Sequence, residues 1–316
     1  MTRLVVGLHV VGVAVTDETV RVLLTRRRGD EARSIESLPF GRLKQDDDKT
    51  LELGLRRSVR ELAAIELGYV EQLYTFGDRF RGAGKSNERI LSIGYLALVR
   101  EADIGAGRSL AFGDCYTMFP WEDWRDGEPS VLRELVSMLK RWASTGDDPS
   151  ERRARRQRAD LLFGRSDAGW DPERVLERFE LLYEAGILPE SQRDAGATPD
   201  QSSASGKALR GDDRRILATA LGRLRGKIRY RPVVFELMPE TFTLFQLQRV
   251  VEALAGTRLH KQNFRRVLEK GRLVEGTGIR DRSAGGRPAE RFRFRAEVTR
   301  ERQVTGVALP KLSSSV

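Results

Sequence analysis

The chain has little of the chemistry that metals and disulfides need. Its 316 residues include one cysteine, Cys115, and two histidines, His9 and His260. A single cysteine excludes an internal disulfide and a multi-cysteine zinc site, and two histidines argue against a histidine-based metal site. The longest apolar runs, such as LVVGLHVVGVAV, are shorter than the roughly 20 residues that span a bilayer. That run also lacks the basic region and cleavage site of a signal peptide. We therefore expect a cytoplasmic protein that requires no metal and no cofactor.

Positive charge is concentrated near the C-terminus. The net charge is +10, but residues 214–295 contain 20 lysines and arginines against seven acidic residues, a surplus of +13. The rest of the chain is therefore slightly acidic, at −3. A basic surplus confined to one segment is typical of a protein that contacts a phosphate backbone. The alternative interpretation is a solvated basic surface without a partner.

The hydrophobic pattern predicts a compact α/β domain at the N-terminus. Residues 3–25 are rich in valine and predict two strands separated by a turn at 16–18. Residues 49–64 have the apolar spacing of a helix. Two more strands are expected at 69–76 and 89–100, and the domain should end near residue 143.

The middle of the chain predicts helices followed by a linker. The run ERRARRQRAD leads into a stretch with helical spacing at 170–186. Residues 190–213 are poor in large apolar residues and rich in Gly, Ser, Asp and Gln, so we interpret them as a flexible linker. The expected divisions are an N-terminal domain at 1–143, a helical insert and linker at 144–212, a C-terminal domain at 213–300, and a tail at 301–316.

Two helices and a basic hairpin follow the linker. In FTLFQLQRVVEAL, residues 242–254, apolar side chains share one face, and Thr243 is a plausible N-cap. Gly256 supplies a tight turn, and HKQNFRRVLEKG begins a second helix that turns Phe264 inward. This order is a helix-turn-helix, whose second helix enters the major groove of double-stranded DNA.

The outward side chains of the second helix have the chemistry that reads bases. Arginine bonds guanine in bidentate fashion, and glutamine or asparagine does the same with adenine. The following hairpin, GIRDRSAGGRPAERFRFR, predicts a wing whose tip carries an arginine to a phosphate or a minor groove. The expected DNA-binding residues are Thr243, Lys261, Gln262, Asn263, Arg265, Arg266, Lys270 and Arg287. An ordinary three-helix bundle with a basic face is the alternative, and RNA is a second one, although no aromatic stacking platform is evident.

The N-terminal domain resembles the Nudix family at its signature helix. LPFGRL followed by KTLELGLRRSVRELAAI resembles the Nudix box GX5EX7REUXEEXGU, where U is aliphatic. The box arginine falls at Arg57, its second glutamate at Glu61 and its closing aliphatic residue at Ile65. A second register aligns Arg60-Glu61-Leu62 with the box REU.

The departures from the box fall on its carboxylates. Lys49 replaces the first glutamate, Ser58 the glutamate after the arginine, Leu62 the third glutamate and Ala64 the closing glycine, and the loop from Gly41 to Arg57 is two residues too long. A Nudix hydrolase needs several carboxylates on one helix face to hold magnesium against a pyrophosphate. Either register loses that set, so we expect a Nudix-like domain that binds a nucleotide diphosphate without cutting it.

Both ends of the chain resemble one family. The segments YVEQLYTFGD, RLRGKIRY, FELMPETFTLFQLQRVVEAL, NFRRVLEKGRLVEGTG and GRPAERFRF resemble those of bacterial Nudix-related transcriptional regulators of NAD metabolism, the NrtR-like and NadQ-type proteins. The resemblance covers about residues 1–120 and 214–296, and the middle segment fits the longer NadQ-like form. It implies an α+β protein, in which a Nudix-like α/β/α sandwich precedes a winged helix-turn-helix domain. It also implies a homodimeric repressor that binds an inverted-repeat operator upstream of NAD biosynthesis or salvage genes.

The resemblance further implies a small nucleotide effector: ADP-ribose, NAD or another adenine nucleotide. The expected ligand-binding residues are Arg57, Glu61, Asp78, Arg79 and Arg81, since basic side chains can pair with phosphates. Their alternative interpretation is a solvated loop with a surface ion pair. Two other functions remain open: a Nudix-type nucleotide diphosphate (ADP-ribose) hydrolase with a nucleic-acid-binding domain, and a constitutive DNA-binding scaffold whose α/β domain only dimerises.

Overall fold

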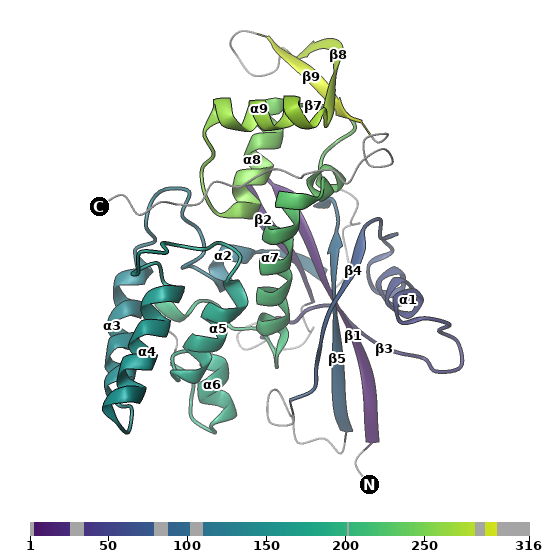
Figure 1. Ribbon diagram of the computed structural model, residues 1–316. Helices are drawn as coiled ribbons and strands as arrows, with labels where there is room; N and C mark the ends of the chain where they lie inside the picture. The colour runs from purple at the N-terminus through teal and green to yellow at the C-terminus, as the bar shows by residue number, and fades with distance from the viewer. Residues whose placement is uncertain are drawn as a thin grey trace.

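The N-terminal part of the chain folds around one mixed sheet. The computed structural model describes residues 3–25, 35–78, 88–101, 110–200, 202–281 and 288–295. The sheet has the strand order β4-β5-β1-β2-β6, and β3 pairs with β1 (Figure 1). Its strands are β1 (Arg3–Thr16), β2 (Thr19–Thr25), β3 (Phe40–Arg42), β4 (Val70–Phe76), β5 (Glu88–Leu98) and β6 (Leu110–Asp114). β1 and β5 are parallel, and the other pairs are antiparallel.

Helices cover both faces of this sheet. Successive side chains of a strand point to opposite faces, and β1 uses both. Val10 packs in the core beneath α1 (Leu51–Ala63). Val11 packs in the core on the other face, which includes α7 (Asp213–Tyr230). The result is the Nudix-like α/β/α sandwich expected from the sequence.

The helix α7 is a layer of the sandwich as well as the lead into the C-terminal domain. It packs against β1, β4 and β5 on one side and against α5 on the other. Ile216, Leu217 and Leu224 are all buried there. The sequence predicts that a separate C-terminal domain begins at residue 213. In the structure, α7 begins at that residue and packs continuously against the sheet and α5.

The expected insert, together with the helix at 131–144 that precedes it, forms a group of helices beside α7 (Figure 1). Its elements are α3 (Val131–Ser144), α4 (Pro149–Leu162), α5 (Val175–Glu184), α6 (Pro189–Asp194) and the 3-10 turn η2 (Ser203–Ser205), and α2 (Cys115–Met118) precedes them. Asp148 caps α4 by accepting hydrogen bonds from the N–H groups of Ser150 and Glu151.

The segment 190–213 differs from the flexible linker that its composition predicts. Ala204 and Leu209 are completely buried. The N–H of Lys207 donates to the carbonyl of Thr117 at 2.9 Å. Small residues and main-chain hydrogen bonds hold this segment in place, which a count of large apolar residues does not detect.

The C-terminal region is a small helical domain with a three-stranded sheet of order β7-β9-β8. Its elements are η3 (Val233–Leu237), β7 (Phe242–Thr243), α8 (Leu244–Ala255), α9 (Lys261–Gly271), β8 (Val274–Asp281) and β9 (Ala289–Phe294). One core runs without interruption from Leu96 in the sandwich through Leu224 of α7 to Leu254 of α8. None of the helices in the described ranges is long and apolar enough to cross a membrane.

Candidate functional sites

The face of α9 that turns away from the core is strongly basic. Phe264 and Leu268 are buried and fix the inward face of the helix. The side chains of Lys261, Gln262, Arg265, Arg266 and Lys270 are exposed on its other side. Within the described part of the chain, no carboxylate lies at ion-pair distance from the cations of this face, so it presents unneutralised charge. We call these five residues the basic face of α9.

The geometry before α9 is that of a helix-turn-helix. Thr243 accepts a hydrogen bond from the N–H of Gln246 at 3.1 Å, and the side-chain oxygen of Gln246 accepts one from the Thr243 N–H at 2.8 Å. This capping box begins α8. Gly256 ends α8 with φ of 68°, a left-handed conformation that favours glycine, and His260 begins α9 without a side-chain cap.

Two residues expected at the DNA surface have other surroundings. Thr243 is 8% exposed and is engaged in the capping box, so the structure does not place its hydroxyl on the basic face of α9. Asn263 is partly buried and accepts a hydrogen bond from Arg266 at 2.8 Å, which holds that guanidinium in position. Arg287 lies outside the described residues.

The Nudix-like helix α1 carries a compact network of charges around Arg57. Its Nε and Nη2 donate to the two carboxylate oxygens of Asp48, both at 2.8 Å, and its Nη1 donates to Glu61 at 3.0 Å. Lys44 Nζ lies 3.5 Å from the other oxygen of Glu61. The hydrogen bonds from Arg57 lower the pKa of Asp48 to about 2 and also lower the pKa of Glu61, so both carboxylates are ionised at neutral pH.

This arrangement does not fit a magnesium ion. Asp48 and Glu61 already face the cations Arg57 and Lys44, which neutralise the charge that a metal would need. No group of three His, Cys, Asp or Glu residues within the described ranges is arranged to hold a metal ion.

The expected ligand residues do not all meet at one place. Arg57 and Glu61 lie together on α1. Asp78 instead accepts a hydrogen bond at 2.6 Å from Arg215 of α7, the helix on the opposite face of the sheet. Arg79 and Arg81 lie outside the described residues.

The end of α1 shows which register of the Nudix box applies. Ala64 follows the helix with φ of 54°, in the left-handed region, where the box has its glycine. Ser58, at a glutamate position, is buried directly against Gly41, where an added Cβ would come 2.1 Å from the Ser58 hydroxyl. The register with Arg57 as the box arginine therefore matches the helix end.

The sequence did not indicate a charge cluster buried between the sandwich and the C-terminal domain. Glu122, Arg178 and Arg225 are each 0% exposed, and we call them the buried charge cluster. Arg178 and Arg225 reach Glu122 at 2.6 and 2.5 Å. Arg225 also donates to the carbonyl of Leu254 at the end of α8, and Tyr116 donates to that of Ala253.

This cluster ties α8 to the sandwich, because cations stabilise the carbonyl end of a helix. The signal in the sequence is an acidic pair flanked by tryptophans, in FPWEDW. A buried acid at such a position needs cations from elsewhere in the chain.

Together these elements define a two-part protein: a Nudix-like sandwich, in which Lys49, Ser58 and Leu62 stand at box glutamate positions, packed against a winged helix. Residues 234–294 match the model of the NrtR DNA-binding winged helix domain. The chain is 40% identical over 83 residues to the "ADPR responsive transcriptional repressor NtrR" of Acinetobacter baylyi, and the match spans 26% of this chain and 33% of that protein.

Solved structures extend the similarity of fold to the whole chain. The structure of Shewanella oneidensis NrtR complexed with a 27mer DNA aligns with a TM-score of 0.57 at 19% identity, covering 96% of this chain and 98% of that one. A MutT/nudix family protein from Enterococcus faecalis aligns with a TM-score of 0.53 at 15% identity, covering 93% and 88%. The resemblance to NrtR-like proteins is thus confirmed, by the family model at the C-terminus and by the fold over both parts.

Proposed function

We propose that this protein is a DNA-binding transcriptional regulator, acting as a repressor of NAD biosynthesis or salvage genes. The observation that carries the proposal is the basic face of α9, presented by a helix-turn-helix and followed by an antiparallel hairpin. Arg265 and Arg266 have the chemistry to bond guanine, and Gln262 to bond adenine. Lys261 and Lys270 have the charge to neutralise phosphates.

The Nudix-like sandwich, in this proposal, binds an NAD-related nucleotide and does not hydrolyse it. ADP-ribose is the first choice, because the Acinetobacter relative is named for its response to ADPR; NAD and other adenine nucleotides are the alternatives. The loss of hydrolysis follows from the carboxylates: Glu61 and Asp48 are bound by Arg57, and Ser58 is buried where the box has a glutamate.

The DNA partner proposed is an inverted repeat bound by a homodimer. A dimer with two-fold symmetry presents two recognition helices about one turn of DNA apart, so its operator carries the same symmetry.

The experiment that tests this function is fluorescence anisotropy on DNA from upstream of NAD biosynthesis genes. ADP-ribose, NAD and ATP are titrated in turn at one fixed salt concentration, because affinity for DNA depends steeply on salt. We expect specific binding and a shift in affinity with one of the three nucleotides. If specific DNA binding is unaffected by all three nucleotides, the proposed nucleotide effector is contradicted. If there is no specific DNA binding, the proposed role as a transcriptional regulator is contradicted.

Hydrolysis is tested separately with ADP-ribose and magnesium. We expect no product above the rate without protein. Magnesium-dependent turnover that disappears in Glu61→Gln would instead establish a Nudix-type hydrolase.

A further inference from the structure

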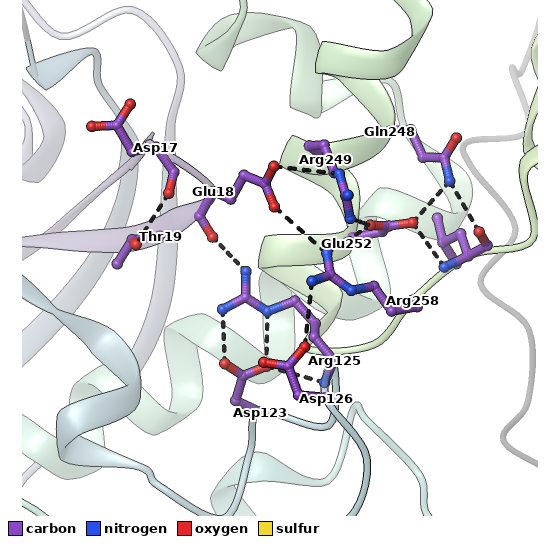
Figure 2. Close-up of polar contacts among 11 residues, drawn as sticks. Asp17, Glu18, Thr19, Asp123, Arg125, Asp126, Gln248, Arg249, Glu252 and Arg258 are labelled. Carbon is purple, nitrogen blue, oxygen red and sulfur yellow. Dashed lines mark hydrogen bonds and ion pairs between the residues drawn. The ribbon is translucent and has the colours of Figure 1, made fainter.

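Charged side chains from the sandwich and the winged helix meet at the turn between α8 and α9 (Figure 2). Glu18 reaches this place from the tip of the β1–β2 hairpin, and Asp126 from the loop between α2 and α3. We call the group the docking network; its members are Glu18, Arg125, Asp126, Arg249, Glu252 and Arg258. None of its members belongs to the basic face of α9 or to the charge network around Arg57.

Glu252 determines the path of the chain into α9. Its side chain is 2% exposed, and its Oε1 accepts hydrogen bonds from the N–H of Leu259 at 3.0 Å and from Gln248 at 2.8 Å. Gln248 also donates to the carbonyl of Leu259 at 2.9 Å. Leu259 directly precedes His260, where α9 begins, so this carboxylate fixes the start of the recognition helix.

Glu252 stays ionised at neutral pH despite its burial. Burial acts to raise the pKa of its carboxyl, but the hydrogen bonds from Leu259, Gln248, Arg258 and Arg249 outweigh it and the pKa is lowered. A buried carboxylate of this kind depends on its cations, because an unpaired buried charge is strongly destabilising.

The two cations that serve Glu252 are shared with Glu18. Arg249 lies 3.0 Å from Glu252 and 3.3 Å from Glu18. Arg258 lies 3.1 Å from Glu252 and 3.6 Å from Glu18. Figure 2 shows the resulting alternation of acid, base and acid, which runs from the sandwich to the turn before α9.

Glu18 lies at the hairpin tip in a backbone conformation that is energetically unfavourable for a residue with a side chain. Asp17 and Glu18 have φ of 48° and 59°, in the left-handed region, which disfavours a side chain as long as that of Glu18. Glycine is the usual residue at this place in a two-residue hairpin, but it would remove the carboxylate. Arg125 donates to the main-chain carbonyl of Glu18 and thereby holds the tip.

We propose that Glu18 is a positioning residue for DNA recognition, which couples the Nudix-like sandwich to the start of α9 through Arg249 and Arg258. The proposal rests on the proposed function and adds the route of its regulation. Glu18 lies in the two-residue turn that follows β1, the strand that lies between β5 and β2 and has α1 packed on one face. A shift of the β1–β2 hairpin therefore acts on the turn before α9 through the Glu18 carboxylate.

The test compares Glu18→Gln with Asp17→Asn in the full-length protein. Glutamine preserves the shape and backbone preference of Glu18 and removes its charge. Asp17 is the matched control, because it shares the turn and the left-handed conformation while its carboxylate points away from Arg249 and Arg258 (Figure 2).

The first readout is hydrogen exchange of a peptide that covers residues 256–264, measured without DNA or nucleotide. We expect exchange at the turn to be about fivefold faster in Glu18→Gln, the factor that an exposed ion pair of about 1 kcal/mol supplies. Asp17→Asn should exchange as the wild type does. Equal exchange in all three proteins would overturn the proposal, whether or not the protein binds a nucleotide.

The second readout is the ratio of operator affinities with and without ADP-ribose. We expect Glu18→Gln to bind ADP-ribose as tightly as wild type while this ratio falls toward one; Asp17→Asn should keep the wild-type ratio. A wild-type ratio in Glu18→Gln would overturn the coupling. A ratio of one already in the wild type would refute ADP-ribose as the effector, and the exchange experiment would then decide about Glu18 alone.

Discussion

The helices α7 and α9 are both rich in basic residues, but the structure uses their charges in opposite ways. Arg214 and Arg225 of α7 are each 0% exposed. Their carboxylate partners, Glu190 and Glu122, come from the insert and the sandwich at 2.7 and 2.5 Å. The cations on the basic face of α9 are exposed and have no such partner among the described residues.

This difference shows what a count of charges along the chain leaves out. The surplus of +13 in residues 214–295 includes Arg214 and Arg225 of α7, which serve packing and are neutralised from outside that segment. Arg229 and Lys227 of α7 also pair with carboxylates of other segments. The positive charge available to a phosphate backbone is therefore centred on α9. It is smaller than the surplus of +13 along residues 214–295 indicates.

The largest effect is expected where the comparison is most direct, between Arg225→Met on α7 and Arg265→Met on α9. Arg225→Met leaves the buried carboxylate of Glu122 without one of its two cations. The variant should lower the free energy of unfolding by about 3–5 kcal/mol. Arg265→Met removes an exposed side chain and should change it by less than about 0.5 kcal/mol. Urea denaturation at neutral pH measures both; similar losses in the two variants would contradict the different roles of the helices.

Acid should destabilise the surroundings of α7. Burial acts to raise the pKa of Glu122, but Arg178 and Arg225 outweigh it and the pKa is lowered from its ordinary value of 4.5. Ionised Glu122 thus stabilises the folded state above pH 4.5, and this contribution is lost as the pH falls through the lowered value.

Melting temperatures of wild type and Glu122→Gln measured as the pH is lowered check this expectation. The variant should be less stable at pH 7, and its stability should fall less steeply in acid. Parallel curves for the two proteins would show that Glu122 does not titrate in this way.

Affinity for DNA should respond to α9 and be insensitive to α7. Arg265→Ala and Arg266→Ala should each weaken specific binding by about 1–3 kcal/mol if they read bases. Arg223→Ala, an exposed arginine of α7, is the matched control and should bind as wild type does. Anisotropy with operator and scrambled DNA measures all three; unchanged affinity in both α9 variants would remove this helix from the interface.

The smallest effect is expected for a contact to phosphate alone. Lys270→Ala should leave the sequence preference unchanged and reduce the slope of log K against log salt by about 0.9, the value for one phosphate contact. Titration at four salt concentrations measures the slope. An unchanged slope would show that Lys270 does not reach the phosphate backbone.

Local sequence patterns predicted the secondary-structure elements and the type of domain in each half of the chain. Alternating valines gave β1 and β2, and apolar spacing gave α1, α8 and α9 close to the observed bounds, because these signals depend on near neighbours in the chain. The outward set of α9 was predicted well for the same reason. Thr243 and Asn263 were less well placed, since their side chains find partners within the domain.

The sequence by itself determined the two-part architecture and the recognition helix. It did so because hydrophobic periodicity and helix caps are read within a few residues. Only the tertiary structure decided which charges are buried, that residues 190–213 are packed, and that Glu18 meets the turn before α9. Those outcomes depend on pairs of residues far apart in the chain: Glu122 with Arg225, and Glu18 with Arg249 and Arg258. The strength of a charge pair is set by distance and burial in space, which separation along the sequence does not report.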